Sequence, residues 1–336
     1  MKDSSIWQPW LRETGLNKQH VIIISPATAN ANNGNWQTAS RWAGFLSSSY
    51  DVSVMEEWDD SHCDLMIALH ARRSATSLAR FAQAFGHRPI LLVLTGTDLY
   101  RDIHSDAQAQ ASLQLATRLV LLQDAGLQQL PPALRAKACV IYQSAPQPPD
   151  TPRVRADARF EVIMIGHLRT EKDPLTFMRA AAVVAPSRIR MTHIGGALDA
   201  ALGRQAESTQ RALPQYRWLG DLPHAQTLEY LAASDMMVIA SRMEGGANVI
   251  IESVVHKVPV LASDIPGNRG MLGDEYAGYF PPGDSTALAA LIDRACKDPV
   301  FRTILSSQCK ERSGLFEPAR ERAALTSAVR ELLAVT

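Results

Sequence analysis

Short apolar runs rich in β-branched residues recur along the chain, and helix-length segments separate most of them. The first half contains VIIIS, DLMIAL, ILLVLT, RLVLLQ and CVIYQ, and the second half contains FEVIMIG, RIRMTHIGG, YRWLG, MMVIA and VPVLAS. Continuous apolar strands of this length are typical of parallel sheets that helices cover on both faces. The alternation therefore predicts an α/β fold built from doubly wound, Rossmann-like sheets.

A proline-rich stretch, QSAPQPPDTPRVR, interrupts this alternation between residues 143 and 155. Its four prolines remove hydrogen-bond donors and restrict their neighbours, so neither a strand nor a helix continues easily through it. We therefore expect a linker between two domains, residues 1–150 and 151–315, with residues 316–336 forming a C-terminal helix that packs on them. Two doubly wound domains that face each other form a cleft between the carboxyl ends of their strands, where such folds bind ligands.

The bulk composition excludes several classes of function. Thirty-four basic and thirty-four acidic residues leave no net charge to attract nucleic acid or an anionic membrane. The four cysteines are scattered and lack the spacing of metal ligands. The polar start has no continuous apolar core for a signal peptide, and no window approaches the ~20 apolar residues of a membrane span. We expect a cytoplasmic protein with small-molecule partners, and the oligomeric state stays open.

The stretch SRMEGGANVIIE follows directly on the run MMVIA. Gly245 and Gly246 would let backbone amides approach a ligand closely, and a helix that begins just after them would direct its unpaired N–H groups to the same place. Glu244 would lie at the strand exit and Glu252 about one turn into the helix, so both carboxylates could flank one pocket. An anion fits the amides, and a carboxylate beside a phosphate site accepts sugar hydroxyl protons.

Two glutamates separated by seven residues, with glycines between them, resemble the motif of GT-B glycosyltransferases of the glycosyltransferase family 4 type. The downstream HKVPVLASDIPGNRGMLGDEYAGYFPPGD is similar to the continuation in that family. The resemblance implies a GT-B fold and a nucleotide-sugar donor. It also implies that Glu252 binds the ribose and that Glu244 contacts the transferred sugar. The residues that would face the sugar and phosphates are Gly245, Gly246, Ala247, Asn248 and Val249.

A second match, VIMIGHLRTEKDP, resembles the strand, turn and basic pair of the same family. It implies that Gly166 borders the nucleotide and that Arg169 and Lys172 hold its diphosphate. The departing diphosphate gains negative charge in the transition state, which fixed cations stabilise. The catalytic candidates are Arg169, Lys172 and Glu244, and we expect neither a metal nor a cofactor beyond the UDP-sugar co-substrate.

Polar loops after strands of the first half would supply the acceptor site. These loops are SPATANANNGNWQTASRW, ALHARRS and LTGTDLYRD, and arginine side chains in them suit a phosphate-like acceptor. A capped turn or a solvated surface charge is the competing interpretation of each loop. Gly34 is a candidate for donor binding, and the acceptor-binding candidates are Asn33, Asn35, His70, Arg72, Thr97, Asp98 and Arg101.

The segments ANNGNWQTA, ALHARRSA, LTGTDLYRD, GHLRTEKDP, HIGGALD, SRMEGGANVIIE and IPGNRGMLGD together resemble one branch of the family, the selenosugar synthases of selenoneine biosynthesis. That resemblance runs from about Val21 to Pro318. It implies transfer of a sugar from a UDP-sugar, expected to be UDP-N-acetylglucosamine, to selenophosphate, with formation of a carbon–selenium bond and release of UDP. His70 or Asp98 would then assist rather than act as an essential base.

Other interpretations remain open at this point. A conventional GT-B glycosyltransferase with an oxygen or nitrogen acceptor would share the donor half, and a sugar-nucleotide epimerase on the same scaffold would need no acceptor. A non-catalytic nucleotide-sugar-binding protein would bind without turnover. The stretch WDDSHCD offers Asp59, Asp60 and Asp64 as oxygen ligands for a divalent ion, but a polar turn explains it more simply.

Overall fold

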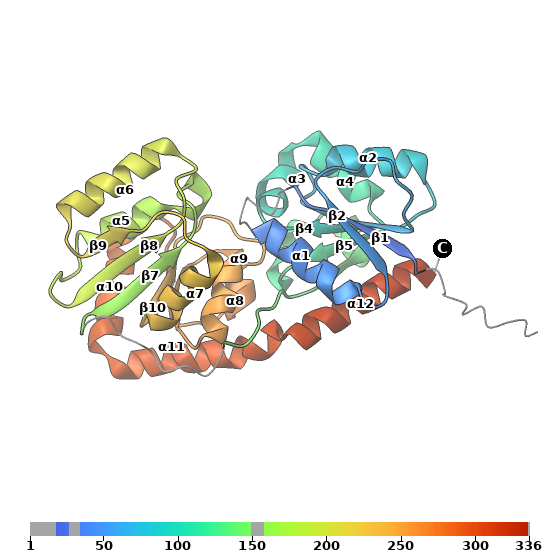
Figure 1. Ribbon diagram of the computed structural model, residues 1–336. Helices are drawn as coiled ribbons and strands as arrows, with labels where there is room; N and C mark the ends of the chain where they lie inside the picture. Colours follow the sequence, from blue (N-terminus) through green and yellow to red (C-terminus); the bar gives the residue numbers. More distant parts are fainter. Residues whose placement is uncertain (1–17, 27–33, 149–157, 335–336) are drawn as a thin grey trace, which may run out of the picture.

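The computed structural model describes residues 18–26, 34–148 and 158–334. The two halves of the chain each form a six-stranded sheet with helices packed around it, and the two domains stand side by side (Figure 1). Neighbouring strands pair in parallel throughout both sheets. The predicted fold class, two Rossmann-like α/β domains, is confirmed.

The N-terminal sheet has the strand order β2-β1-β3-β4-β5-β6. Because β2 pairs on one side of β1 and β3 on the other, the chain reverses its direction of winding between β1 and β3. The bounds of these strands are β1 His20–Ile24, β2 Asp51–Met55, β3 Leu65–Leu69, β4 Ile90–Leu94, β5 Arg118–Leu121 and β6 Ala138–Val140.

The C-terminal sheet has the order β12-β11-β10-β7-β8-β9, so its reversal lies between β7 and β10. In a doubly wound sheet the loops that leave the two strands at such a reversal diverge to opposite faces and open a crevice between them. The strand bounds are β7 Phe160–Ile165, β8 Ile189–Ile194, β9 Tyr216–Trp218, β10 Met236–Ile239, β11 Val260–Ser263 and β12 Tyr279–Phe280.

Helices connect successive strands and cover the sheets. In the N-terminal domain they are α1 Gly34–Leu46, α2 Ala75–Ala84, α3 Ile103–Ser105 and α4 Ala107–Leu115, with shorter helical turns η2 Asp98–Asp102, η3 Asp124–Gln129 and η4 Pro132–Lys137. After β7 they are α5 Pro174–Ala181, α6 Ala200–Ala212, α7 His224–Ala233, α8 Asn248–Val255, α9 Pro266–Leu272, α10 Ser285–Lys297, α11 Pro299–Arg312 and α12 Pro318–Ala334, with η5 Thr170–Lys172 and η6 Ser313–Phe316.

The central strands are buried on both faces, as their unbroken apolar sequences predict. All residues of β3, β4, β10 and β11 are buried. The C-terminal domain holds one large apolar core, whereas the N-terminal sheet has a separate core on each of its faces. Both domains therefore provide rigid strand ends on which loops can hold functional side chains.

Helix α12 packs on the N-terminal domain although it follows the C-terminal domain in sequence. Leu325, Val329 and Leu332 share a core with Val21 of β1 and Trp42 of α1. Figure 1 shows this helix, in red, extending from the C-terminal domain along the N-terminal one. Because this apolar contact crosses between domains, α12 tethers them in addition to the chain connection before β7. Within the described residues, no helix combines the length and the apolar character that a membrane crossing requires.

Candidate functional site

The two motifs expected to bind the donor meet at the reversal point of the C-terminal sheet. Strand β7 leads into Gly166 and the basic turn η5, and β10 leads into SRMEGGANVIIE. These two strands are hydrogen-bonded neighbours although about 75 residues separate them, since Met236 pairs with Val162. Their loops therefore leave the sheet next to each other at its carboxyl edge.

Lys172 and Glu244 are in direct contact at this edge. The Lys172 ammonium lies 2.5 Å from Oε1 of Glu244, and the Ser241 hydroxyl donates to the same oxygen at 2.6 Å. Glu244 is only 8% exposed, and Ser241 is completely buried. The carboxylate is thus fixed by two donors from two different loops.

The Arg169 side chain has a buried hydrogen-bond donor that the described residues leave unpaired. Its Nε is shielded from solvent and has no partner among them. Such an atom is costly to bury, because it has lost water without gaining another acceptor. An anionic oxygen is the acceptor that a guanidinium group pairs with most strongly. Arg169 therefore suits an anionic ligand at the same strand end as Lys172.

Gly245 and Gly246 form close contacts between the domains, which sequence reasoning missed. A Cβ atom on Gly245 would lie 2.4 Å from the carbonyl oxygen of Thr95, and one on Gly246 would lie 2.6 Å from Cβ of Leu122. The sequence predicts these glycines to admit a ligand, but their nearest neighbours are atoms of the N-terminal domain. The absence of side chains here lets the loop after β10 meet the loop after β4.

Glu252 lies on α8, where the sequence places it, and pairs with a histidine that the sequence did not single out. Nε2 of His224, the first residue of α7, is 2.8 Å from Oε1 of Glu252. This hydrogen bond is the main reason that the pKa of His224 is raised above its usual value, against the opposing effect of partial burial. His224 thus holds the carboxylate from the neighbouring helix.

A cavity of about 270 Å³ lies beside Glu252, between helices of the two domains. Residues of α1 form one wall, residues of α7 and α8 form the other, and the segment after β6 contributes the rest. The lining residues are Gln37, Ser40, Arg41, Ser144, Ala145, Pro146, His224, Leu228, Asn248, Glu252 and His256. Asn248 and Glu252, both predicted to bind the donor, thus border one space, and Ala247 and Val249 flank Asn248 at the start of α8.

Helix α1 begins opposite α8. Gly34 is the first residue of α1, and a Cβ atom on it would lie 3.4 Å from Nδ2 of Asn248. Asn35 lies in the first turn of the same helix, next to this contact. Asn33 and the rest of the asparagine-rich loop lie outside the described residues. The structure therefore brings two of the predicted positions, Gly34 and Asn35, to the start of α8.

Asp98 is a structural anchor for two loops of the acceptor side. It is completely buried, and its carboxylate accepts from the backbone amides of Ala71 at 2.9 Å, Thr95 at 3.0 Å and Gly96 at 2.8 Å. These bonds tie the end of β3 to the end of β4. Asp98 therefore positions the loops after β3 and β4, and its expected contact with the acceptor stays a prediction.

His70 follows β3 with a left-handed backbone, φ 74°, and is 3% exposed. A non-glycine residue in this conformation is uncommon and often marks a functional site. Its Nε2 is 3.0 Å from the Thr97 hydroxyl. Burial lowers the pKa of His70 despite the opposing effect of Asp98 and Asp102, so the ring is favoured in its neutral form.

The two acceptor-side arginines differ in their surroundings. Arg72 pairs with Asp106 at 3.1 Å and is about half exposed. Arg101 bonds to Asp102 at 3.0 Å and reaches across to Glu171 of the C-terminal domain at 3.2 Å. Arg101 thus lies next to the basic turn that contains Lys172, whereas Arg72 is held within its own domain.

Glu321 of α12 connects three segments at the domain junction. Only 1% exposed, it accepts from Nε of Arg41 at 2.8 Å, from the Trp42 indole at 2.7 Å and from the backbone amide of Ser144 at 2.8 Å. Arg41 and Trp42 lie on α1, and Ser144 lies in the segment that leaves the N-terminal domain. Sequence reasoning missed this residue because a lone glutamate in a polar helix gives no signal of its own.

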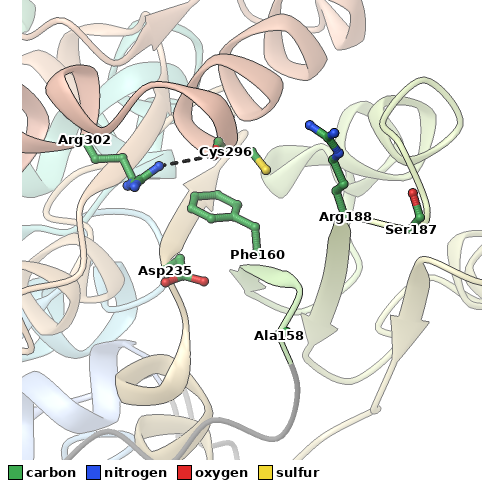
Figure 2. A pocket seen from close by; sticks show the side chains of 7 residues that line it. All are labelled: Ala158, Phe160, Ser187, Arg188, Asp235, Cys296 and Arg302. Carbon is green, nitrogen blue, oxygen red and sulfur yellow. Dashed lines mark hydrogen bonds between the residues drawn. The ribbon is translucent and has the colours of Figure 1, made fainter.

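A second hollow, of about 400 Å³, lies in the C-terminal domain and shares no lining residue with the first cavity. It opens at the amino end of β7, the edge of the sheet opposite Arg169 and Lys172. Figure 2 shows Phe160 between Arg302 and Cys296, with Arg188 across the opening. Arg302 donates to the carbonyl oxygen of Cys296 at 3.3 Å. Doubly wound sheets bind ligands at the carboxyl ends of their strands, whereas this hollow lies at the amino end, away from the two motifs expected to bind the donor.

The acidic stretch WDDSHCD does not assemble a metal site in the structure. Asp59 accepts from Ser61, Asp60 pairs with Arg80, and Asp64 accepts from the backbone of His20. No group of three or more histidine, cysteine, aspartate or glutamate side chains among residues 18–26, 34–148 and 158–334 is arranged to hold a metal ion. The competing interpretation as a polar turn accounts for these contacts.

Comparisons with known proteins concern mainly the C-terminal half. Residues 151–313 match the family described as "Glycosyl transferases group 1". The putative teichuronic acid biosynthesis glycosyltransferase TuaC of Bacillus subtilis (strain 168) is 35% identical over 83 residues, 25% of this chain and 21% of that protein. The UDP-Gal:alpha-D-GlcNAc-diphosphoundecaprenol alpha-1,3-galactosyltransferase of Escherichia coli is 26% identical over 162 residues, 46% of this chain and 40% of that protein. The chain thus spans less than half the length of these relatives.

Solved structures resemble nearly the whole chain. HepE from Anabaena, solved in complex with UDP and glucose, has a TM-score of 0.73 at 16% identity and covers 93% of this chain and 100% of its own. Sucrose-phosphate synthase from Thermosynechococcus elongatus has a TM-score of 0.77 at 17% identity and covers 95% of this chain and 100% of its own. At such identities the likeness establishes the fold. The chain therefore has the GT-B fold, and its residues 151–313 match the group 1 glycosyl transferase family.

Proposed function

We propose that this protein is a glycosyltransferase that takes a sugar from a UDP-sugar, and that its acceptor is selenophosphate. The observation that carries the first part is the cluster at the reversal point of the C-terminal sheet. There the bonded pair of Lys172 and Glu244 lies in the loops that also contain Arg169, whose buried Nε is unpaired within the described part of the chain.

The proposal assigns each part of a nucleotide-sugar to a side chain of this region. Arg169 and Lys172 would bind the diphosphate and stabilise the charge that develops as it departs. Glu244, next to Lys172, would accept a hydrogen bond from a hydroxyl group of the sugar. Glu252 would bind the ribose, and the bond from His224 to its Oε1 would hold the carboxylate in place. The metal-free expectation is part of the proposal: excess chelator should leave the rate unchanged.

Relatives favour a uridine nucleotide. The name of the E. coli relative specifies UDP-Gal, and the Anabaena structure contains UDP and glucose. For the transferred sugar we propose N-acetylglucosamine, on the resemblance to the selenosugar synthases. Selenophosphate as acceptor rests on the same resemblance. Arg101, close to the basic turn, is the residue best placed to add a cation on the acceptor side.

The proposed reaction is a displacement at the anomeric carbon. A selenium lone pair forms the new carbon–selenium bond, the bond from that carbon to the diphosphate oxygen breaks, and its electron pair leaves with UDP. Deprotonated selenium needs no general base, whereas an alcohol acceptor does. A buried His70 that favours its neutral form fits an assisting role in such a reaction. Positioning and leaving-group stabilisation would then supply most of the rate.

The donor half of the proposal is tested by UDP release from UDP-N-acetylglucosamine and by calorimetric binding of UDP. Arg169→Ala should lower the rate of release by roughly 10²-fold or more, because one preorganised donor to the developing charge is lost. Arg294→Ala is the matched control, since Arg294 is an exposed arginine of α10 that pairs with Asp298 just after the helix. A wild-type protein that neither binds UDP nor releases it from any UDP-sugar would contradict the donor assignment.

The acceptor half is tested by anaerobic incubation with UDP-N-acetylglucosamine and selenophosphate, with mass spectrometry of the products. The expected product is a sugar that carries the selenium isotope pattern and forms in step with UDP. Parallel reactions contain phosphate, thiophosphate, alcohols and amines. Release of UDP with an alcohol or amine but not with selenophosphate would retain the glycosyltransferase and exclude selenium. Consumption of the UDP-sugar without any acceptor and without UDP release would indicate an epimerase.

A further inference from the structure

Tyr100 lies in the segment LTGTDLYRD of the N-terminal domain, from which sequence reasoning selected Thr97, Asp98 and Arg101 but not this tyrosine. It lies in η2, a π-helical turn that follows β4, and its backbone amide donates to Gly96 at 3.0 Å. Single π-helical turns are frequent at functional sites. The buried Asp98 carboxylate fixes the start of this turn to the backbone of Thr95 and Gly96. Tyr100 is thus held on a rigid loop.

The hydrogen bond that Tyr100 makes has a fixed direction. Nε2 of Gln123 donates to the phenolic oxygen at 2.8 Å. The amide of Gln123 cannot be reversed without loss, because its Oε1 accepts from the backbone amide of Gly126 at 3.1 Å. Gln123 is completely buried, so no solvent could replace either bond. The Tyr100 oxygen is therefore an acceptor toward Gln123, and its hydrogen must point elsewhere.

The phenolic hydrogen remains available to a ligand. Across the residues that the structure describes, Gln123 is the one hydrogen-bond partner of the hydroxyl. Burial, and to a smaller extent the negative charge of Glu244, raises the pKa of Tyr100 to about 12, while the bond from Gln123 acts in the opposite direction. The group is therefore a neutral donor at physiological pH.

Tyr100 lies on a loop of the N-terminal domain that neighbours the loop of Glu244, the carboxylate that the proposed function assigns to the sugar. The loops that carry the two residues touch, because a Cβ atom on Gly96 would lie 3.2 Å from the backbone nitrogen of Gly245. A neutral phenol is a weaker partner for a diphosphate than the nearby cations, but it is well matched to a hydroxyl or carbonyl oxygen. We infer that the hydroxyl of Tyr100 donates a hydrogen bond to an oxygen substituent of the transferred sugar, and so helps to select that sugar.

This inference rests on the proposed donor specificity and adds a residue from the opposite domain to the sugar site. The sugar would then be held by Glu244 as acceptor and by Tyr100 as donor. A site that pairs both kinds of group with a sugar discriminates strongly against an analogue that lacks the paired oxygen, because a buried group is left without its partner. The arrangement also requires the two domains to be closed together.

The first test compares Tyr100→Phe with wild type in UDP release and in UDP binding. We expect kcat/KM for the UDP-sugar to fall about tenfold, as for one lost hydrogen bond. The affinity for UDP, which lacks the transferred sugar, should change by less than about twofold. Tyr142→Phe is the matched control. It removes a hydroxyl that donates to the carbonyl oxygen of Gly270 at 3.1 Å within the protein, and it should retain wild-type kinetics.

The second test uses UDP-sugars that lack one hydroxyl or the N-acetyl group. One analogue should lose about tenfold in kcat/KM with wild type but not with Tyr100→Phe, because the two changes remove the same bond. Equal losses in both proteins for every analogue would overturn the inference, as would unchanged kinetics in Tyr100→Phe or a loss of UDP affinity as large as the loss of turnover. Failure of wild type to release UDP would instead contradict the proposed function.

Discussion

The ammonium group of Lys172 donates to Oε1 of Glu244 at 2.5 Å, although 72 positions separate the two residues in sequence. Their strands, β7 and β10, are neighbours at the reversal point of the C-terminal sheet. One pair of side chains thus links the motif expected to hold the diphosphate to the motif expected to contact the transferred sugar and the ribose. Lys172 is close enough to the carboxylate of Glu244 to orient it. On the proposed function, the same ammonium group also contacts the phosphates.

Replacement of Lys172 by alanine should lower kcat/KM for UDP release by roughly 10²-fold to 10³-fold, because it removes both a cation at the leaving group and a partner of Glu244. Steady-state kinetics measure this loss. Lys297→Ala should leave the rate unchanged, since Lys297 forms an exposed pair with Asp293 on α10. Equal rates for wild type and Lys172→Ala would place the leaving group elsewhere.

The pairing of His224 with Glu252 predicts a dependence of stability on pH. The pKa of His224 is raised in the folded protein, mainly by its bond to Glu252. A raised pKa contributes stability that is complete below the unfolded value near 6.5 and is lost as the pH rises through the folded value. The difference in unfolding free energy between wild type and His224→Ala should therefore be larger at pH 5.5 than at pH 9. Because His224 is 45% exposed, solvent screening limits the change to about 0.5 kcal/mol.

Chemical denaturation at the two pH values gives this comparison, and a difference that grows with pH would contradict the assignment. Calorimetry on Glu252→Ala supplies a functional counterpart. If Glu252 binds the ribose, its loss should weaken UDP binding by about tenfold, the equivalent of one good hydrogen bond. Undiminished affinity would exclude Glu252 from the donor site.

Glu321 should be important for stability although it lies outside the proposed site. Glu321→Ala leaves the buried Trp42 indole and the Ser144 amide without an acceptor and Arg41 without its counter-charge. Removal of one partner from such a buried set costs about 3–5 kcal/mol. Thermal or denaturant unfolding measures the cost. Glu331→Ala on the same helix breaks an exposed pair with Arg118 and should cost less than about 1 kcal/mol. Similar costs for both variants would contradict the role of Glu321 in joining α12 to the domain junction.

Gly245→Ala tests whether close contact of the domains is needed. The added methyl group would lie 2.4 Å from the Thr95 carbonyl oxygen, so the two loops must separate. We expect loss of UDP release together with a larger radius of gyration in small-angle X-ray scattering. Gly44→Ala is the control, because its Cβ meets nothing within 4 Å and alanine favours the α1 helix. A fully active Gly245→Ala would show that the contact is dispensable.

The strands and their class could be predicted because parallel strands buried on both faces need unbroken apolar sequence. The edge strands β2 and β12 were not predicted. The sequence DVSVM of β2 alternates weakly and is only partly buried, and β12 has two residues, Tyr279 and Phe280. Their strand state depends on pairing with a neighbour that is already in place, and a short window of sequence contains no information about that neighbour.

For the site, local sequence sufficed where one segment supplies both the backbone geometry and the side chains. The start of α8 after Gly245 and Gly246, and the basic turn after β7, are of this kind. Asp98 shows the limit, because its position in a polar loop does not reveal that three backbone amides donate to its carboxylate. Two of these amides are local, but the third, of Ala71, comes from the end of another strand, and a short window of sequence contains no information about it.

The sequence by itself determined that this chain forms two doubly wound domains and that two of its loops carry the residues expected to bind a sugar diphosphate, because apolar periodicity and glycine spacing act over a few residues. Only the tertiary structure decided that Lys172 meets Glu244, that His224 holds Glu252, that Tyr100 directs its hydrogen away from Gln123, and that Glu321 joins α12 to the domain junction. Each of these contacts joins segments far apart in the chain, and the order of strands in the sheets and the packing of one domain on the other bring them together.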